Sequence, residues 1–150
     1  MDTQKWLSVI DNVTGYTKKR EAIREEEIIK SKSLSKIITL YPVNAIIICN
    51  DYLEGTKIIE KLYNKIKLHN GVSFYGANKI LVNIEDFKMS SITTMINDDI
   101  YRLKGTTINF LLFTNEINDD IMKNVIRNLY SQMPHDDGGV SISRIDQNKI

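Results

Sequence analysis

The clearest signal for the fold is the sequence PVNAIIICNDYLEGTKIIEKLYNKI, residues 42–66. Residues 45–49 form a continuous apolar run of strand length, which is typical of a strand covered on both faces. Residues 53–68 then place Leu53, Ile58, Ile59 and further apolar residues at helical spacing. A buried strand that leads directly into an amphipathic helix predicts a parallel sheet with helices packed on it.

The same alternation continues along the chain. KILVNI (79–84) and TTINFLLFT (106–114) predict a second and a third buried strand, and 72–75 a short one. Residues 89–103 are predicted to form a second amphipathic helix. The order indicates an α/β fold with a mostly parallel, doubly wound sheet in three layers, preceded by N-terminal helices.

A last helix begins after Asn118, whose side chain is a good N-cap, with Asp119 and Asp120 in the first turn. We expect one domain over residues 1–150. It consists of a helical extension (1–33), a core (34–132) and a polar tail (133–150) in which 140–143 can form a short edge strand.

Composition narrows the class of protein. Twenty basic and nineteen acidic residues give a net charge of +1, which argues against a surface built wholly for nucleic acid or membrane. The single cysteine, Cys49, excludes an internal disulfide and a cysteine-based zinc site and favours a reducing, cytoplasmic location. The sequence shows neither a signal peptide nor an apolar run long enough to span a bilayer, so no membrane partner is expected.

Polar clusters follow the three main predicted strands: residues 50–57 (NDYLEGTK), 85–87 (EDF) and 114–116 (TNE). Ligands of parallel α/β sheets bind beyond the carboxyl ends of the strands, so we expect the three clusters to meet at one edge. A glycine-containing turn before a helix can hold phosphate, and paired acids can hold Mg²⁺.

These segments resemble the core of a P-loop ATPase of the AAA+ type, over about residues 34–132. PVNAIIICNDYLEGTKIIEKLY resembles the strand, phosphate loop and helix, KILVNIEDF the Walker B strand, and TINFLLFTN the sensor-1 strand. The resemblance implies a P-loop or Rossmann-like three-layer fold that binds ATP with Mg²⁺. It assigns phosphate contact to Asn50, Gly55, Thr56 and Lys57, magnesium to Glu85, general-base duty to Asp86 and γ-phosphate sensing to Asn115.

The phosphate loop departs from its pattern, G-x-x-x-x-G-K-[ST]. Asn50 replaces the first glycine, Thr56 the lysine and Lys57 the hydroxyl residue, so Lys57 is rotated about 100° away from the expected direction. No clear arginine finger is present, Arg127 and Arg144 being only candidates. We therefore expect a catalytically degenerate module that acts by binding, as a subunit of a nucleic-acid replication or packaging assembly.

Other interpretations stay open. The chain can be a protein-interaction or inhibitor domain of a virus or mobile element, with no nucleotide site and no cofactor. A metal-dependent phosphatase or nuclease using Asp51, Glu85 and Asp86 is a further alternative, as is the sugar-contacting lobe of a periplasmic-binding-type regulator. Each of these acids can equally cap a helix or turn.

Two other features have simple structural explanations. Cys49 ends a buried strand and is expected to pack as a small hydrophobe. Lys57, Lys61 and Lys65 lie at i, i+4 and i+8 on one helix face. Such a row is usually a solvated surface, yet it is the best local candidate for contact with a nucleic-acid backbone. A protein partner or an oligomer is expected in either case.

Overall fold

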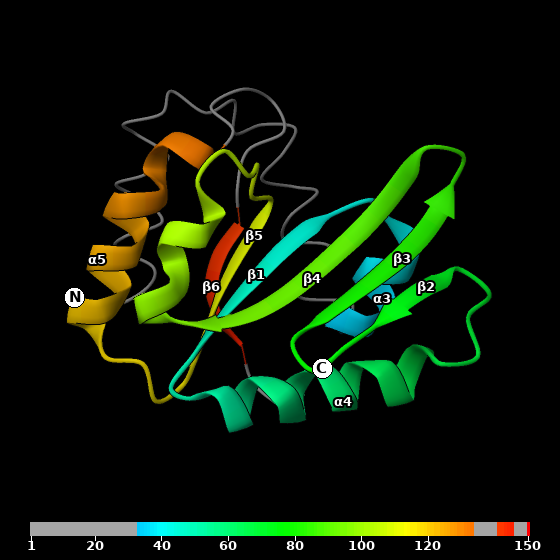
Figure 1. Ribbon diagram of the computed structural model, residues 1–150, viewed down its shortest axis with the longest axis horizontal. Coiled ribbons are helices and arrows are strands. Elements are labelled where there is room, and N and C mark those ends of the chain that lie inside the picture. The colour runs from blue at the N-terminus through cyan, green and yellow to red at the C-terminus, as the bar shows by residue number, and fades with distance from the viewer. Residues whose placement is uncertain (1–32, 134–140, 146–149) are drawn as a thin grey trace.

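The computed structural model describes residues 33–133, 141–145 and 150 (Figure 1). It contains one six-stranded sheet in the order β2–β3–β4–β1–β5–β6. The strands are β1 Asn44–Cys49, β2 Val72–Tyr75, β3 Lys79–Glu85, β4 Lys88–Ile96, β5 Phe110–Thr114 and β6 Ser141–Ile145. The helices are α3 Leu34–Leu40, α4 Tyr52–Ile66 and α5 Asp119–Leu129, with 3-10 segments η1 Asn97–Leu103 and η2 Tyr130–Gln132. The predicted helical extension and most of the polar tail lie outside the described residues.

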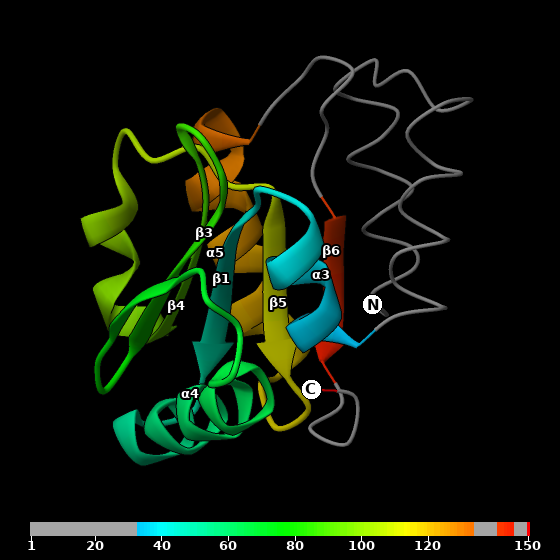
Figure 2. The same cartoon turned by 90° about the vertical axis from the view of Figure 1, so that its right-hand side faces the viewer.

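The sheet is mixed. β1 pairs in parallel with β4 and β5, and β5 pairs in parallel with β6. On the other side, β3 is antiparallel to β4, and β2 is antiparallel to β3. Helices α3 and α4 cover one face, while η1 and α5 cover part of the other (Figures 1 and 2). The predicted α/β three-layer fold is therefore confirmed, with an antiparallel extension on one side of its parallel half.

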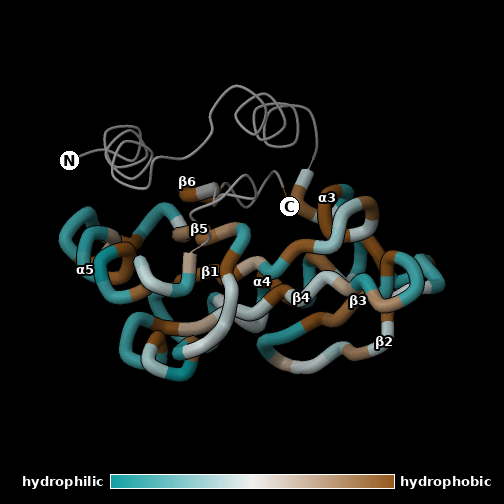
Figure 3. The backbone as a smooth tube through the Cα atoms, turned by 90° about the horizontal axis from the view of Figure 1, so that it is seen from above, coloured by the Kyte–Doolittle hydropathy of each residue, from teal (hydrophilic) through white to brown (hydrophobic). Residues whose placement is uncertain are grey.

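Strand β1 lies at the centre because its side chains are apolar on both faces. Ala45, Ile47 and Cys49 pack into the core beneath α3 and α4, and Ile46 and Ile48 into the core beneath η1 and α5. Hydrophobic residues are accordingly concentrated on the central strands, and hydrophilic residues on the outer side of α5 (Figure 3). No helix in the described part of the chain is both long enough and apolar enough to cross a membrane.

The helix predicted over 89–103 is wrong. Most of this segment is strand β4, and its end is the 3-10 segment η1. The buried Ser90, Ile92 and Thr94 alternate with the partly exposed Ser91 and Thr93 in a period of two, and the run of β-branched residues at 92–94 favours a strand. The apolar residues at 92, 95 and 103 also satisfy helical spacing, so the pattern alone did not separate the two structures.

The connection between β3 and β4 is a tight hairpin. Glu85 pairs with Lys88 across it, with 2.8 Å between Oε1 and Nζ. Phe87, at the tip, has a left-handed backbone with φ 62° and a fully exposed ring. The left-handed conformation is unfavourable for a bulky residue by about 1–2 kcal/mol.

We expect Phe87→Asn to raise the free energy of unfolding by about 1 kcal/mol, because asparagine tolerates left-handed angles and the exposed ring loses no buried contact. Urea unfolding followed by circular dichroism measures this change. Asp86→Asn, at the neighbouring position with ordinary φ, is the matched control and should stay within about 0.5 kcal/mol of the parent. A loss of stability in Phe87→Asn would contradict the assignment of strain to this turn.

Candidate functional site

The carboxyl ends of β1, β4, β5 and β6 lie at one edge of the sheet, because these four strands run in parallel. Only Asn50 and Asp51 separate the end of β1 from the start of α4. Asp51 is the N-cap of α4, and its Oδ1 accepts a hydrogen bond of 2.8 Å from the backbone N–H of Glu54. The turn is therefore short and is capped by its own carboxylate.

Glu54 links this turn to the end of β5. Its Oε1 accepts hydrogen bonds from the backbone N–H of Asn50 at 2.9 Å and from the hydroxyl of Thr114 at 2.7 Å. The Nδ2 of Asn50 donates to Oε2 of Glu116 at 2.7 Å, which makes a second link. The structure thus brings the first and third predicted clusters together. The backbone N–H groups of Asn50 and Glu54, which an incoming anion would need, are already paired with carboxylates.

The remaining residues predicted for phosphate contact lie within α4. Gly55 is buried, and a Cβ placed on it would stand 2.7 Å from Thr94 Oγ1, so the glycine lets the helix approach β4. The hydroxyl of Thr56 donates to the carbonyl oxygen of Tyr52 at 3.1 Å, one turn earlier. Lys57 is exposed, as are Lys61 and Lys65 in the same row along α4. Contact of this row with nucleic acid stays a prediction.

Glu85 and Asp86 do not reach this edge, which corrects the prediction that all three clusters meet. β3 runs antiparallel to β4, so its carboxyl end lies at the opposite edge, beside the start of β4. A strand that is apolar throughout has the same pattern in either direction, and the sequence therefore did not reveal the reversal. Glu85 and Asp86 belong instead to the exposed β3–β4 hairpin.

Two acidic residues that the sequence interpretation missed lie at the carboxyl edge, where Glu85 and Asp86 were expected. Asp98 and Asp99 follow β4, and the Tyr52 hydroxyl donates to Asp99 Oδ2 at 2.7 Å. This hydrogen bond raises the pKa of Tyr52 above its ordinary value. The signal, two acids directly after an apolar run, was present but lay inside the segment assigned to a helix.

Arg144, one of the two arginine-finger candidates, holds the turn after β5. Its Nη1 donates to the carbonyl oxygens of Thr114 and Asn115 at 3.1 and 3.3 Å, and its Nη2 pairs with Asp119 at 3.0 Å. Arg127 is exposed in the last turn of α5. Asn115 is exposed, and its predicted role as a γ-phosphate sensor stays a prediction.

Cys49 is buried, and burial, with the negative charges of Glu54 and Asp51, raises its thiol pKa to about 12. The thiol is therefore protonated near neutral pH and packs as a small hydrophobe. Within the described residues, no group of three or more His, Cys, Asp or Glu side chains is arranged to hold a metal ion.

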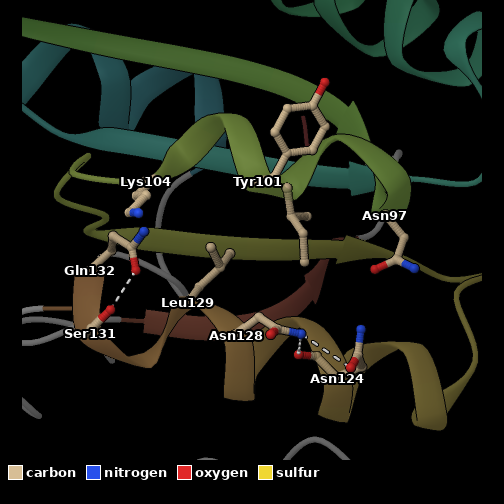
Figure 4. A pocket seen from close by; sticks show the side chains of 9 residues that line it. Asn97, Tyr101, Lys104, Asn124, Asn128, Leu129, Ser131 and Gln132 are labelled. Atoms are coloured by element: carbon tan, nitrogen blue, oxygen red, sulfur yellow. Dashed lines mark hydrogen bonds between the residues drawn. The ribbon is translucent and has the colours of Figure 1, made fainter.

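A cavity of about 500 Å³ lies between η1 and α5, away from the carboxyl-edge network (Figure 4). Carboxamides line it, from Asn97 on η1 and from Asn124, Asn128 and Gln132 on the opposite wall. Asn128 Nδ2 donates to the backbone carbonyl and Oδ1 of Asn124, and Gln132 Nε2 donates to the Leu103 carbonyl. The Oδ1 of Asn97 is buried and has no hydrogen-bond partner in the described structure.

Two solved structures have a fold similar to that of this chain. The chain is similar to the large terminase ATPase domain of Thermus phage P74-26, with 14% identity and a TM-score of 0.51, and to an arginine-to-alanine mutant of it, with 13% identity and the same TM-score. Each match covers 84% of this chain and 56% of the terminase domain. No protein-family model and no curated protein sequence matches the chain. The comparisons show that the chain shares the fold of this terminase ATPase domain over the matched part.

Proposed function

We propose that the chain is a non-catalytic binding module with the fold of a P-loop ATPase, acting as a subunit of a nucleic-acid packaging assembly of a virus. The observation that carries the proposal is the closed turn between β1 and α4. Asp51 accepts a hydrogen bond from the N–H of Glu54 at 2.8 Å and Glu54 accepts one from the N–H of Asn50 at 2.9 Å, and the charges of both carboxylates oppose an incoming phosphate. The resemblance in fold to a phage terminase ATPase domain supports the setting.

The proposal also includes a relationship to ATPases of the AAA+ type and the interpretation of residues 50–57 as a degenerate phosphate loop. The reversed β3 removes Glu85 and Asp86 from the edge where the resemblance would use them. Hydrolysis would also need a phosphate loop that curls around the nucleotide, whereas two residues join β1 to α4 here. Binding of a protein partner or of nucleic acid remains as the function of the module.

Isothermal titration of the full chain with ATP and Mg²⁺ tests the proposal. We expect no heat of binding up to millimolar ATP, because the N–H groups of Glu54 and Asn50 already donate to the protein's own carboxylates, whose charges repel phosphate. Lys57→Ala is the matched variant. Binding that is measurable in the parent and lost in Lys57→Ala would overturn the proposal and restore the nucleotide site at Asn50, Gly55, Thr56 and Lys57.

The second candidate is a protein-interaction or inhibitor domain outside any packaging assembly. The observation that favours it is Phe87, a fully exposed aromatic ring at the tip of the β3–β4 hairpin. Sedimentation velocity on the parent chain and on Phe87→Ser tests whether this ring mediates association between copies. A concentration-dependent dimer that disappears in the variant would support this candidate.

A further inference from the structure

Half of one sheet face is uncovered in the described structure. Ile80, Val82 and Ile92 point into the core beneath α3 and α4, so the alternate residues of β3 and β4 point to the other side. No described helix lies over β2, β3 and the adjoining half of β4 on that side (Figure 1). The residues that share this open face are Phe74, Lys79, Leu81, Asn83, Met89, Ser91 and Thr93.

Phe74 gives the open face an exposed aromatic ring. Phe74 is opposite Leu81, which is opposite Ser91, so the three form one row across the strands. Phe74 is 48% exposed. A Cβ on Gly76 would stand 2.9 Å from Phe74 Cε1, so the ring lies against the backbone of this glycine. The ring is therefore held in place while one side remains accessible for stacking.

A groove beside this row carries unpaired cations. It has a volume of about 370 Å³, and its lining includes Lys79 of β3, Ser91 and Thr93 of β4, and Arg102 of η1. Within the described residues, neither Lys79 nor Arg102 forms an ion pair. The one carboxylate in the groove, that of Asp99, accepts the Tyr52 hydroxyl. The groove therefore carries two positive charges and one negative charge, together with hydroxyl and amide hydrogen-bonding groups.

The exposed side chain of Tyr101 contacts Arg102. The guanidinium carbon of Arg102 lies 5.8 Å from the centre of the Tyr101 ring, and its Nε donates to the tyrosine hydroxyl at 3.4 Å. Cation–π contact of this kind orders an exposed arginine without neutralising it. Arg102 therefore keeps its charge available to an anionic ligand.

We propose that the open face of β2–β3–β4 binds single-stranded nucleic acid, with a base stacked on Phe74 and backbone phosphates beside Lys79 and Arg102. Aromatic rings interleaved with cations and polar groups on a sheet are typical of single-strand binding. A protein interface would instead have a contiguous apolar centre, whereas four of the seven side chains that share this open face are polar. The inference rests on the proposed function, since it names the partner of the module and the surface used.

Fluorescence anisotropy of the full chain with a labelled oligothymidylate of about 15 nucleotides tests the proposal. We expect binding that Phe74→Ala weakens about tenfold or more and that Phe74→Tyr preserves within about threefold, because tyrosine keeps the stacking surface. The double variant Lys79→Ala/Arg102→Ala should reduce the slope of log K against log salt by about 1.4, which is about 0.7 for each lost phosphate contact.

The double variant Lys36→Ala/Lys67→Ala is the matched control, since it also removes two positive charges, from exposed positions on α3 and at the end of α4, and leaves the open face intact. It should change the affinity by less than about threefold. The proposal is overturned if the parent does not bind the single strand, or if it binds duplex DNA of equal length as tightly. It is also overturned if the triple variant Lys57→Ala/Lys61→Ala/Lys65→Ala, rather than Phe74→Ala, abolishes binding, or if Phe74→Ala only disrupts a dimer. Circular dichroism confirms that each variant is folded.

Failure of this inference is distinguishable from failure of the proposed function. If neither ATP nor the oligonucleotide binds, the open face has no role in nucleic-acid binding and the module acts through protein contacts alone. If ATP binds the parent and Lys57→Ala abolishes that binding, the proposed function is wrong whatever the oligonucleotide does.

Discussion

Gly55→Val is expected to lower the free energy of unfolding by about 3 kcal/mol. Gly55 is buried where α4 meets the sheet, and a Cβ added there would stand 2.7 Å from Thr94 Oγ1 and 3.1 Å from Thr94 Cβ. Both distances are shorter than the contact of about 3.5–4.0 Å at which carbon atoms pack best. Valine adds two further methyl groups in the same direction, so the helix or the strand must move.

Urea unfolding followed by circular dichroism measures this loss, and Glu60→Val is the matched control. Glu60 is exposed on the same helix, so its replacement reports only the lower helix propensity of valine, about 0.5 kcal/mol. A loss below about 1 kcal/mol in Gly55→Val would show that α4 can shift outward without cost and would contradict the packing explanation.

Variants of Gly55 and of its neighbour Thr94 test whether the glycine is needed for packing rather than for phosphate binding. Gly55→Ala should cost less than the valine, since alanine gains about 1 kcal/mol of helix propensity. Thr94→Ala removes the oxygen that the new Cβ would meet, so the double variant should be more stable than the sum of the two changes by about 1 kcal/mol or more. Additive effects would mean that Thr94 does not constrain Gly55.

Much of the parallel half of the fold was predictable because its signals are local. The apolar run before Asn50 makes β1. Asp51 and Asn118 cap α4 and α5 with side-chain hydrogen bonds to the N–H groups of Glu54 and Ile121. Each of these signals lies within a few residues of the element that it specifies, so chain order was enough to find it.

Strand direction was not predictable in the same way, because it depends on pairing between distant segments. KILVNI is compatible with a parallel or an antiparallel strand, and only the tight turn at residues 85–88 sends the chain back beside itself. Strand direction also explains which parts of the candidate site were predicted correctly. Asn50 and the residues after β5 meet, since both follow parallel strands, whereas Glu85 and Asp86 were displaced by the reversal.

Glu54→Ala is expected to lower the free energy of unfolding by about 2–3 kcal/mol. The backbone N–H of Asn50 and the hydroxyl of Thr114 both lose their acceptor, and Thr114 is only 1% exposed, so water does not readily replace it. The negative charge that favours the start of α4 is also lost. Urea unfolding measures the change, with Glu60→Ala as an exposed control that should stay within about 0.5 kcal/mol.

Thr114→Val and Glu54→Gln show what this carboxylate does. Valine removes the Thr114 hydroxyl, so combining it with Glu54→Ala should cost less than the sum of the single losses by about 1 kcal/mol, and additivity would contradict the hydrogen bond. Glutamine keeps an acceptor oxygen for Asn50 and Thr114 but removes the charge, so most of the stability should remain. If ATP and Mg²⁺ produce heat with Glu54→Gln and none with the parent, the charge of Glu54 is what excludes phosphate. If neither binds, the short turn between β1 and α4 excludes it by shape, because no loop is present to surround the anion.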